Sequence, residues 1–434
     1  MTYLKRWLSL IVFLSFLIIG PESSWASDHP IQQMIEDAKE GDTVHIPEGS
    51  YNEPITIDKQ IHLIGNGKVI FNINEDKPAI SIKADKVTLQ NIAINYQSEV
   101  PNETAILIEG DQNTLSEIEI VTNQRGIFLD ESHQNILENI SLEGPEHLPI
   151  QARQRGIDLW KSDQNVLRQL NITNVEDGIY IESSAANEVY KNKVTKSRYG
   201  YHLMFTKKTK LHHNESHENI SGMMVMGTNE TQVHDNLLTH NQKDVQSLGL
   251  LLFDVKNAVV ENNEIAHNRL GIFIESAKDN TLIENDVRNN FIGLQFKFAE
   301  NNVIEGNAFS ANAVQGQAEE SANNKTNLNY WSDHQGLDRN GNGQSDLSYK
   351  VDPFYLHLTN EYPAFRLLFQ SPGMIFLDNM MHTPVEQQLV DQTPLMENPL
   401  VDHDLSQEKN LSFILISSIL FVFSLTSIFF GVKK

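Results

Sequence analysis

The sequence predicts an all-β protein: a right-handed, single-stranded parallel β-helix in which short strands stack coil upon coil. A segment that begins with glycine and then alternates apolar with other residues returns about every 22 residues, and an asparagine-marked segment follows most copies. A unit of this size cannot close a core alone, so it must stack on copies of itself. The period of two excludes an α-solenoid, and the LxxLxL signature of leucine-rich repeats is missing.

The glycine-led copies start at spacings of 30, 22, 22, 22, 27, 22 and 22 residues. In order they are GIFLD (126), GIDLW (156), GIYIE (178), GYHLM (200), GMMVM (222), GLLLF (249), GIFIE (271) and GLQFK (293), with looser copies AISIK (79) and AILIE (105) before them. Gly and Asn suit the corners, because both tolerate left-handed backbone and stacked Asn side chains can hydrogen-bond along a ladder.

Residues 1–26 have the order of a secretory signal peptide, with Lys5 and Arg6, an apolar run from Trp7 to Ile19, and a small-x-Ala site at Ala26. An uncleaved anchor is the alternative, although the run is short of the ~20 residues that a span needs. An amphipathic helix over IQQMIEDAKEGD then covers the open end of the solenoid. This helix and the following GDTVHIPEGSY resemble the N-terminal cap of pectate-lyase-like β-helices, and we expect cap and β-helix over 27–327.

The C-terminus reads differently. Residues 411–432 contain no charge and are long enough to cross a bilayer, and Lys433 and Lys434 are expected on the cytoplasmic side. We expect a separate C-terminal region over 328–372 and an extended linker over 373–410, where Pro394 and Pro399 oppose regular structure. Everything from 27 to 410 is therefore expected outside the cytoplasmic membrane, anchored by the C-terminal helix.

Composition narrows the possible partners. A net charge of −24 argues against nucleic acid and anionic lipid surfaces. The chain has no cysteine, so it has no disulfides, and any soft metal chemistry must use methionine and histidine.

Methionine and histidine residues are predicted to lie close together on two adjacent coils. Alternation sends the second and fourth residues after each glycine outward. His202 and Met224 hold the second position of their coils, and Met204 and Met226 hold the fourth. At a strand spacing of about 4.8 Å, the four should form a two-by-two patch exposed to solvent. Thioethers and an imidazole without carboxylate favour Cu(I) over zinc or calcium.

A protein-docking surface is the alternative for this patch and is compatible with copper. It would be extended by Leu251, Phe253 and Phe273. Three histidines in the turn region of the same coil either assist the metal or are ordinary surface residues: His212, His213 and His217.

A second constellation lies in NYWSDHQGLDRNGNGQSDLSY (329–349). Positions 1, 3, 5, 7 (backbone) and 9 of a calcium loop are held by Asp338, Asn340, Asn342, Gln344 and Asp346, with Gly343 at the sharp turn. Position 12 is Tyr349 rather than Glu, which excludes an ordinary EF-hand. A structural Ca²⁺ loop with ligands from elsewhere and an Asx-rich turn without an ion both remain open.

The chain resembles the NosD family from near His29 to about Pro399. The residues that show the resemblance are RYGYHLMF (198–205), the next coil ending at Met226, the 329–349 block and NEYPAFRLLFQSP (360–372). It implies a non-enzymatic accessory protein of nitrous oxide reductase maturation, working outside the cytoplasmic membrane. The implied partners are an ABC transporter permease and ATPase, a copper chaperone that supplies the metal, and the apo nitrous oxide reductase that receives it.

Residue by residue, His202 and Met204 match the family's His-x-Met strand, and Met226 matches a methionine one coil later. Met224 is less securely matched. The C-terminal span is not universal among relatives. We interpret it as an anchor in a cell where a diffusing protein would be lost.

Two other function classes stay open. A polysaccharide lyase, hydrolase or epimerase could use a sugar platform with paired carboxylates made of Asp158, Trp160, Tyr180 and Glu182. Against it, the patch lacks the basic residues that lyases use on acidic sugars, and no residue stands out as catalytic. The third class is a purely structural or adhesive β-helix.

Overall fold

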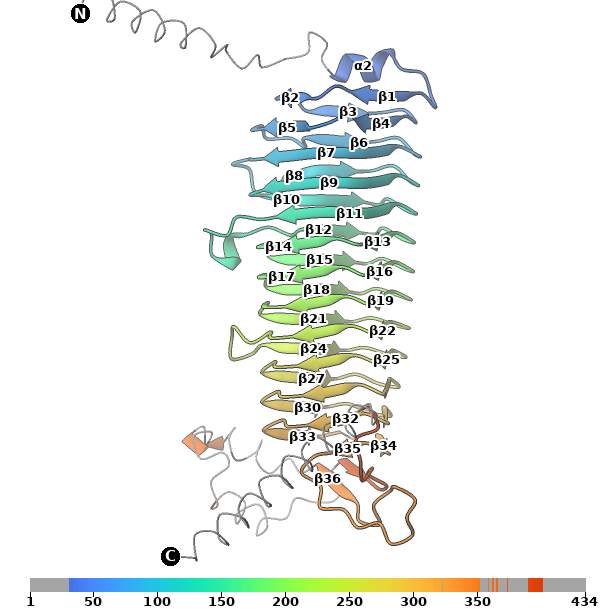
Figure 1. Cartoon of the computed structure of the whole chain (residues 1–434), viewed down its shortest axis with the longest axis vertical. Helices are drawn as coiled ribbons and strands as arrows, with labels where there is room; N and C mark the ends of the chain where they lie inside the picture. Colours follow the sequence, from blue (N-terminus) through green and yellow to red (C-terminus); the bar gives the residue numbers. More distant parts are fainter. Residues whose placement is uncertain are drawn as a thin grey trace, which may run out of the picture.

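The chain forms one long stack of β-coils with its strands perpendicular to the long axis (Figure 1). The computed structural model describes residues 31–321, 323–351, 358, 361–362, 364–365, 373 and 389–400. In these residues the strands form a 12-stranded parallel sheet B and a 25-stranded sheet A, which confirms the predicted parallel β-solenoid. The predicted signal peptide and membrane span lie outside the described residues. Among the described residues, no helix is long and apolar enough to cross a membrane.

Sheet B consists of one strand per coil. Its members are β3 (Ile55–Ile57), β6 (Ile80–Ile82), β8 (Thr104–Ile108), β10 (Arg125–Asp130), β12 (Ile157–Trp160), β15 (Asp177–Glu182), β18 (Tyr199–Met204), β21 (Ser221–Met226), β24 (Leu248–Phe253), β27 (Leu270–Glu275), β30 (Ile292–Lys297) and β33 (Val314–Glu319).

Sheet A supplies the other walls of the solenoid. Its first members are β1 (Thr43–Ile46), β2 (Gly49–Tyr51), β4 (His62–Gly65), β5 (Val69–Ile73), β7 (Thr88–Tyr96), β9 (Thr114–Thr122), β11 (Ile136–Glu143), β13 (Val166–Arg168), β14 (Asn171–Thr173), β16 (Glu188–Tyr190), β17 (Lys193–Thr195), β19 (Lys210–His212) and β20 (Glu215–His217). The rest are β22 (Gln232–His234), β23 (Leu237–Thr239), β25 (Val259–Glu261), β26 (Glu264–Ala266), β28 (Thr281–Ile283), β29 (Asp286–Arg288), β31 (Val303–Glu305), β32 (Ala308–Ser310), β34 (Lys325–Asn327), β35 (Tyr330–Trp331), β36 (Tyr349–Val351) and β37 (Leu389–Asp391).

The helix α2 (Ile31–Asp37) closes the N-terminal end, as predicted (Figure 1). Ile31 and Ile35 are buried against the first coil. The Gln32 side chain accepts a hydrogen bond from the backbone N–H of Thr56 at 2.9 Å and donates one to the Thr56 carbonyl at 3.3 Å. The helix therefore covers the first strand of sheet B in place of a further coil.

The interior is filled by the residues that alternation sends inward. Tyr201 and Met223, each the first residue after its glycine, are completely buried. The glycine at the start of the strand leaves no room for a side chain, because a Cβ at Gly200 would lie 2.3 Å from Ser216 Oγ and 2.6 Å from the carbonyl oxygen of Gly222. The predicted strand start is thus fixed by close approach of one coil to the next.

Asparagine ladders hold the corners, as predicted. In one ladder each side-chain oxygen after the first accepts from the backbone N–H of the asparagine one coil before, and each side-chain amide donates to a backbone carbonyl. Its members are Asn192, Asn214, Asn236, Asn263, Asn285, Asn307 and Asn329. All of them are buried, so their amides satisfy backbone groups that water cannot reach.

Replacing Asn236 with alanine is expected to destabilise the fold. Its Nδ2 donates to the Leu211 carbonyl at 2.9 Å, and its Oδ1 accepts from the Asn214 N–H at 3.0 Å. Each buried group left unpaired costs about 1–3 kcal/mol. Chemical denaturation of the full chain measures the loss. Gln232→Ala, at an exposed position of the same coil, is the control, and an equal midpoint for both variants would contradict the ladder's role.

The C-terminal end differs from the prediction. Residues 389–391, inside the expected linker, form β37, which pairs with β34 in parallel and with β36 in antiparallel. Leu395 then bridges Tyr330 and Gln344. The linker prediction is wrong for this stretch, because the exposed edge of the last coil offers hydrogen-bond partners to a segment that is distant in sequence.

Candidate metal centre

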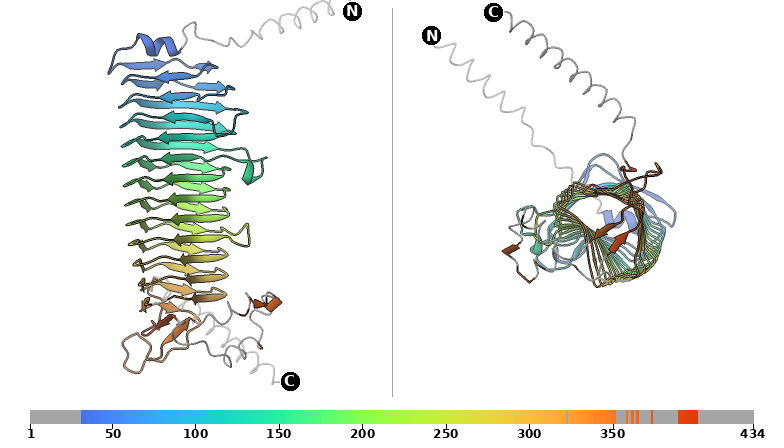
Figure 2. Two further views of the ribbon diagram at one scale, coloured as in Figure 1. Left: turned by 180° about the vertical axis from the view of Figure 1, so that it is seen from behind. Right: turned by 90° about the horizontal axis from the view of Figure 1, so that it is seen from below.

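The four predicted copper ligands lie on neighbouring strands of sheet B. The register pairs His202 of β18 with Met224 of β21, and Met204 with Met226. The expected two-by-two arrangement is therefore present. Two longer loops, residues 144–155 and 240–247, lie before and after these coils and protrude on the same side of the stack (Figures 1 and 2).

The arrangement is less exposed than predicted. His202 is 7% exposed and Met224 is 8% exposed, whereas Met204 and Met226 are half-buried. The expectation that all four protrude into solvent is wrong for the first two. The rings of Tyr180 and Tyr199 pack against the imidazole in T-shaped pairs, with centroids 4.8 and 5.2 Å away. Alternation determines the face on which a side chain lies, and the neighbouring aromatic rings determine whether water reaches it.

A buried carboxylate binds the inner side of the imidazole. The Nδ1 atom of His202 lies 2.8 Å from Asp177 Oδ2, and Asp177 is completely buried. Arg198 donates to both oxygens of Asp177, through Nε and Nη2 at 2.8 Å each. Burial raises the pKa of Asp177, but the hydrogen bonds from His202 and Arg198 outweigh it and hold the pKa below its usual value.

The other ring nitrogen is unsatisfied. Among the described residues, His202 Nε2 is buried and has no hydrogen-bond partner. Buried polar atoms nearly always have one, so this atom needs an explanation, and a metal ion is one that an imidazole nitrogen fits. Sulfur atoms on the same and the adjacent strand make the surroundings soft. No group of three or more His, Asp or Glu side chains in the described residues is placed to hold a metal ion.

A tyrosine links Met204 to a carboxylate. The hydroxyl of Tyr180 lies 2.8 Å from Glu182 Oε2 and 3.3 Å from Met204 Sδ. Burial and the hydrogen bond to Glu182 raise the pKa of Tyr180, so the hydroxyl keeps its proton. The guanidinium of Arg155 lies over the Tyr180 ring, 3.6 Å from its centroid.

The predicted sugar platform is not open. Asp158 is 2% exposed and forms ion pairs with Arg155 at 3.0 Å and Arg125 at 3.4 Å. Burial raises the pKa of Asp158 despite both arginines. The view that basic residues are missing here is also wrong, since Arg125, Arg155 and Arg198 all lie beside these coils. Each of them is bound to a buried or half-buried carboxylate.

A groove of about 520 Å³ leads to the site at Met224. Leu251 and Phe273 belong to its apolar part, and Arg198, Asp244 and Glu275 to its polar part. The loop that contains Asp244 makes this coil five residues longer than its neighbours, since Gly222 and Gly249 are 27 residues apart.

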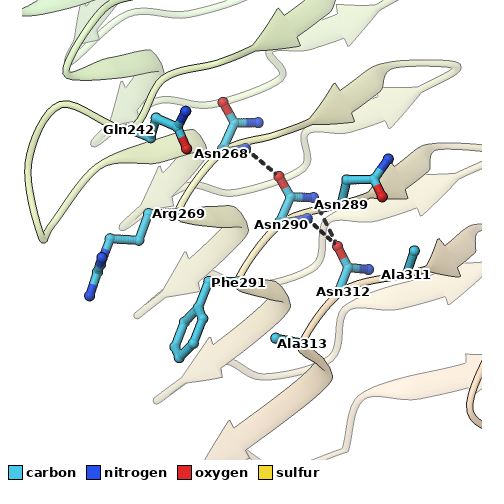
Figure 3. Close-up of a pocket in the computed structure, with 9 residues that line it drawn as sticks. All are labelled: Gln242, Asn268, Arg269, Asn289, Asn290, Phe291, Ala311, Asn312 and Ala313. Carbon is cyan, nitrogen blue, oxygen red and sulfur yellow. Dashed lines mark hydrogen bonds between the residues drawn. The ribbon is translucent and has the colours of Figure 1, made fainter. Parts of the chain in front are cut away.

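A second hollow of about 560 Å³ lies at the corner of later coils (Figure 3). Its row of amides, Asn268, Asn290 and Asn312, belongs to an asparagine ladder, and these amides are hydrogen-bonded to one another and to backbone. Arg269 and Phe291 lie side by side at its rim, 5.7 Å from guanidinium carbon to ring centroid. No predicted site residue lines this hollow.

The three additional histidines do not join the four copper candidates. His212 and His217 belong to sheet A, and His213 follows His212 directly. His212 stacks on Tyr190 and His234, with ring centroids 4.9 Å apart in each pair.

The loop predicted for calcium is held by its own hydrogen bonds. Asp338 accepts four backbone N–H groups, from residues 340, 341, 342 and 343. These hydrogen bonds, chiefly the one from Gly343, hold the pKa of Asp338 below its usual value. Asp346 accepts hydrogen bonds from the backbone N–H and the Nε–H of Arg339, both at 3.0 Å. The segment 394–396 packs on this loop, through Met396 N–H to the Gly343 carbonyl at 3.0 Å. Calcium binding stays a prediction.

Comparison with protein families supports the resemblance found in the sequence. The family model described as "Periplasmic copper-binding protein (NosD)" matches residues 139–344. The resemblance to this family is thus confirmed over a shorter range than predicted, and the range includes all four copper candidates. A comparison with curated proteins gave no match.

Solved structures share the fold. The family 28 exopolygalacturonase of Yersinia enterocolitica has a TM-score of 0.52 and 9% identity, covering 69% of this chain and 76% of the enzyme. The tailspike protein of E. coli bacteriophage HK620 has a TM-score of 0.51 and 9% identity, covering 66% of this chain and 65% of the tailspike. At these identities the likeness concerns the β-helix alone.

Proposed function

We propose that this chain, which is similar to the NosD family, receives Cu(I) outside the cytoplasm and passes it to apo nitrous oxide reductase. The main support is the buried Nε2 of His202, which lacks a partner on a strand that also holds Met204 and is paired with a strand holding two further methionines. Copper is cargo in this proposal and not a resident cofactor. Thioether ligands suit a cargo site, because no proton has to leave or return when the metal binds and departs.

The proposal includes the partners that the resemblance implies. An ABC transporter permease and ATPase would act with the chain, and a copper chaperone would supply the ion. The rim of the site supports a partner contact, since Phe205 is 59% exposed and Phe253 37% exposed next to the half-buried Met204 and Met226. Residues 411–432 would anchor the chain, with Lys433 and Lys434 in the cytoplasm and the signal peptide 1–26 directing export.

The test is a titration of the full-length chain with Cu(I) against a chromophoric chelator, with Zn²⁺ as the comparison metal. We expect stoichiometric Cu(I) binding and much weaker zinc binding. In cells that lack the chain, nitrous oxide reductase should accumulate without its full copper content. Absence of Cu(I) binding, both with and without the transporter, would overturn the proposal.

We also propose that the chain has no turnover of its own. The carbohydrate-active alternative needs accessible carboxylates, whereas Asp158 is ion-paired and buried and Glu182 is hydrogen-bonded to Tyr180. Release of products from uronate polymers by the purified chain would favour that alternative instead.

A further inference from the structure

Asp177 is the first residue of strand β15, and its carboxylate contacts the imidazole of His202 on the next coil. It immediately precedes Gly178, and its carboxylate is completely buried. Three donors surround it: Nε and Nη2 of Arg198, and Nδ1 of His202, all at 2.8 Å. The remaining nitrogen of the guanidinium, Nη1, binds Glu176 Oε1 at 3.0 Å. Arg198 therefore holds Asp177 through a bidentate pair and is itself held by a second acid.

This arrangement determines which nitrogen of His202 is protonated. An ionised carboxylate can only accept hydrogen bonds, so the proton between the two residues belongs to Nδ1. A neutral imidazole with its proton on Nδ1 has a bare lone pair on Nε2. That is the buried atom without a partner among the described residues.

We infer that Asp177, held in place by Arg198, is a positioning residue that fixes the Nδ1–H tautomer of His202 and so presents a bare Nε2 to Cu(I). This inference rests on the proposed function. Metal-bound histidines commonly donate their second N–H to a carboxylate, which orients the ring and raises the basicity of the ligating nitrogen.

The same contacts contribute to metal selectivity. Three carboxylates of the preceding coil already have partners: Asp177 and Glu176 bind Arg198, and Glu182 binds the hydroxyl of Tyr180. Of the two acids that line the groove beside Met224, Glu275 lies 3.8 Å from Lys297, and Asp244 accepts the backbone N–H of Gln246. Hard oxygen ligands, which would favour zinc or calcium, are thus engaged, while imidazole nitrogen and thioether sulfur remain.

The variant Asp177→Asn tests the inference. Its amide can donate to Nδ1, which moves the imidazole proton to Nε2, where it blocks the metal-binding lone pair. We expect Cu(I) affinity to fall about 10- to 100-fold, the usual cost of losing such a partner. The direct readout needs no metal: ¹⁵N NMR of the histidine-labelled full chain at alkaline pH, with His202→Gln used to assign the signal. The wild type should show a protonated Nδ1, and the variant a protonated Nε2.

The matched control is Asp158→Asn. It makes the same chemical change in another buried, arginine-paired carboxylate of sheet B, but it does not contact His202, so affinity and tautomer should stay unchanged. Should Asp177→Asn fail to fold, Arg198→Lys replaces it. That variant keeps the charge but loses the fork that holds Asp177 in place, so the preference for the Nδ1–H tautomer should weaken and copper affinity should fall, both by less than in Asp177→Asn.

Either of two results overturns the inference: a wild-type His202 with its proton on Nε2, or wild-type copper affinity in folded Asp177→Asn. A failure of the proposed function looks different, because the wild type would then bind no copper while the NMR result could still show the Nδ1–H tautomer.

Discussion

A chain with His202→Ala and Met204→Leu together is expected to lose high-affinity Cu(I) binding. The first change removes the buried, unpartnered nitrogen, and the second removes a sulfur atom from the same strand. Leucine conserves the volume of methionine, so packing is little disturbed. Because two of the proposed ligands are lost, the expected fall in affinity exceeds the ~100-fold upper cost of losing one outer-shell partner. Competition with a Cu(I) chelator measures it.

Met223→Leu is the matched control for this experiment. Met223 belongs to strand β21, as do Met224 and Met226, but it points into the core and is completely buried. The same substitution there should leave copper affinity unchanged. Equal affinities for the double variant, the control and the wild type would show that His202 and Met204 do not bind the metal.

Much of this fold follows from the sequence, because one local rule is repeated many times. Each glycine-led segment contains the same alternation, so the clear copies indicate the structure of coils whose own pattern is weak. The register of His202 against Met224 follows from the 22-residue spacing. The corners were equally predictable, since buried asparagines recur at fixed intervals.

The burial of the site could not be predicted from this rule. The two rings that cover His202 belong to Tyr180 on the preceding coil and Tyr199 at the start of its own strand. Alternation predicts the face on which a side chain lies but not its rotamer. Asp177 was missed for a related reason. It stands before the glycine, outside the alternating segment. Charged residues precede the glycine on three consecutive coils, at Arg125, Arg155 and Asp177, and this is the signal that could have revealed it.

The C-terminal error has another origin. Strand β37 pairs with β34 across more than 60 residues of sequence, so no local pattern indicates it. Pro394 and Pro399 are expected to oppose regular structure, but Leu395 between them still forms single bridges to Tyr330 and Gln344.

The second large effect is expected at this C-terminal end, from Asp391→Ala. One carboxylate oxygen, Oδ2, accepts three hydrogen bonds: from the backbone N–H and the amide of Asn329, at 3.0 and 3.1 Å, and from Trp331 Nε1 at 3.1 Å. Asp391 is completely buried and ends the asparagine ladder that begins at Asn192. Alanine leaves the Asn329 backbone N–H and the Trp331 Nε1–H without an acceptor, at a cost of about 1–3 kcal/mol each, whereas the Asn329 amide keeps the carbonyls of Ile304 and Asn327.

The destabilisation caused by Asp391→Ala should stay near the C-terminal coils, because each coil of a solenoid contacts mainly its neighbours. We therefore expect faster amide hydrogen exchange over residues 325–331 and a lower unfolding midpoint, while copper affinity at His202, more than five coils away, stays at the wild-type level. Asp391→Asn keeps an oxygen acceptor and should lose less stability than the alanine variant.

If β37 detaches, the freed edge of β34 becomes available for pairing with a second chain, which sedimentation would detect as self-association. Unchanged exchange over 325–331 in Asp391→Ala would mean that β37 does not close the stack.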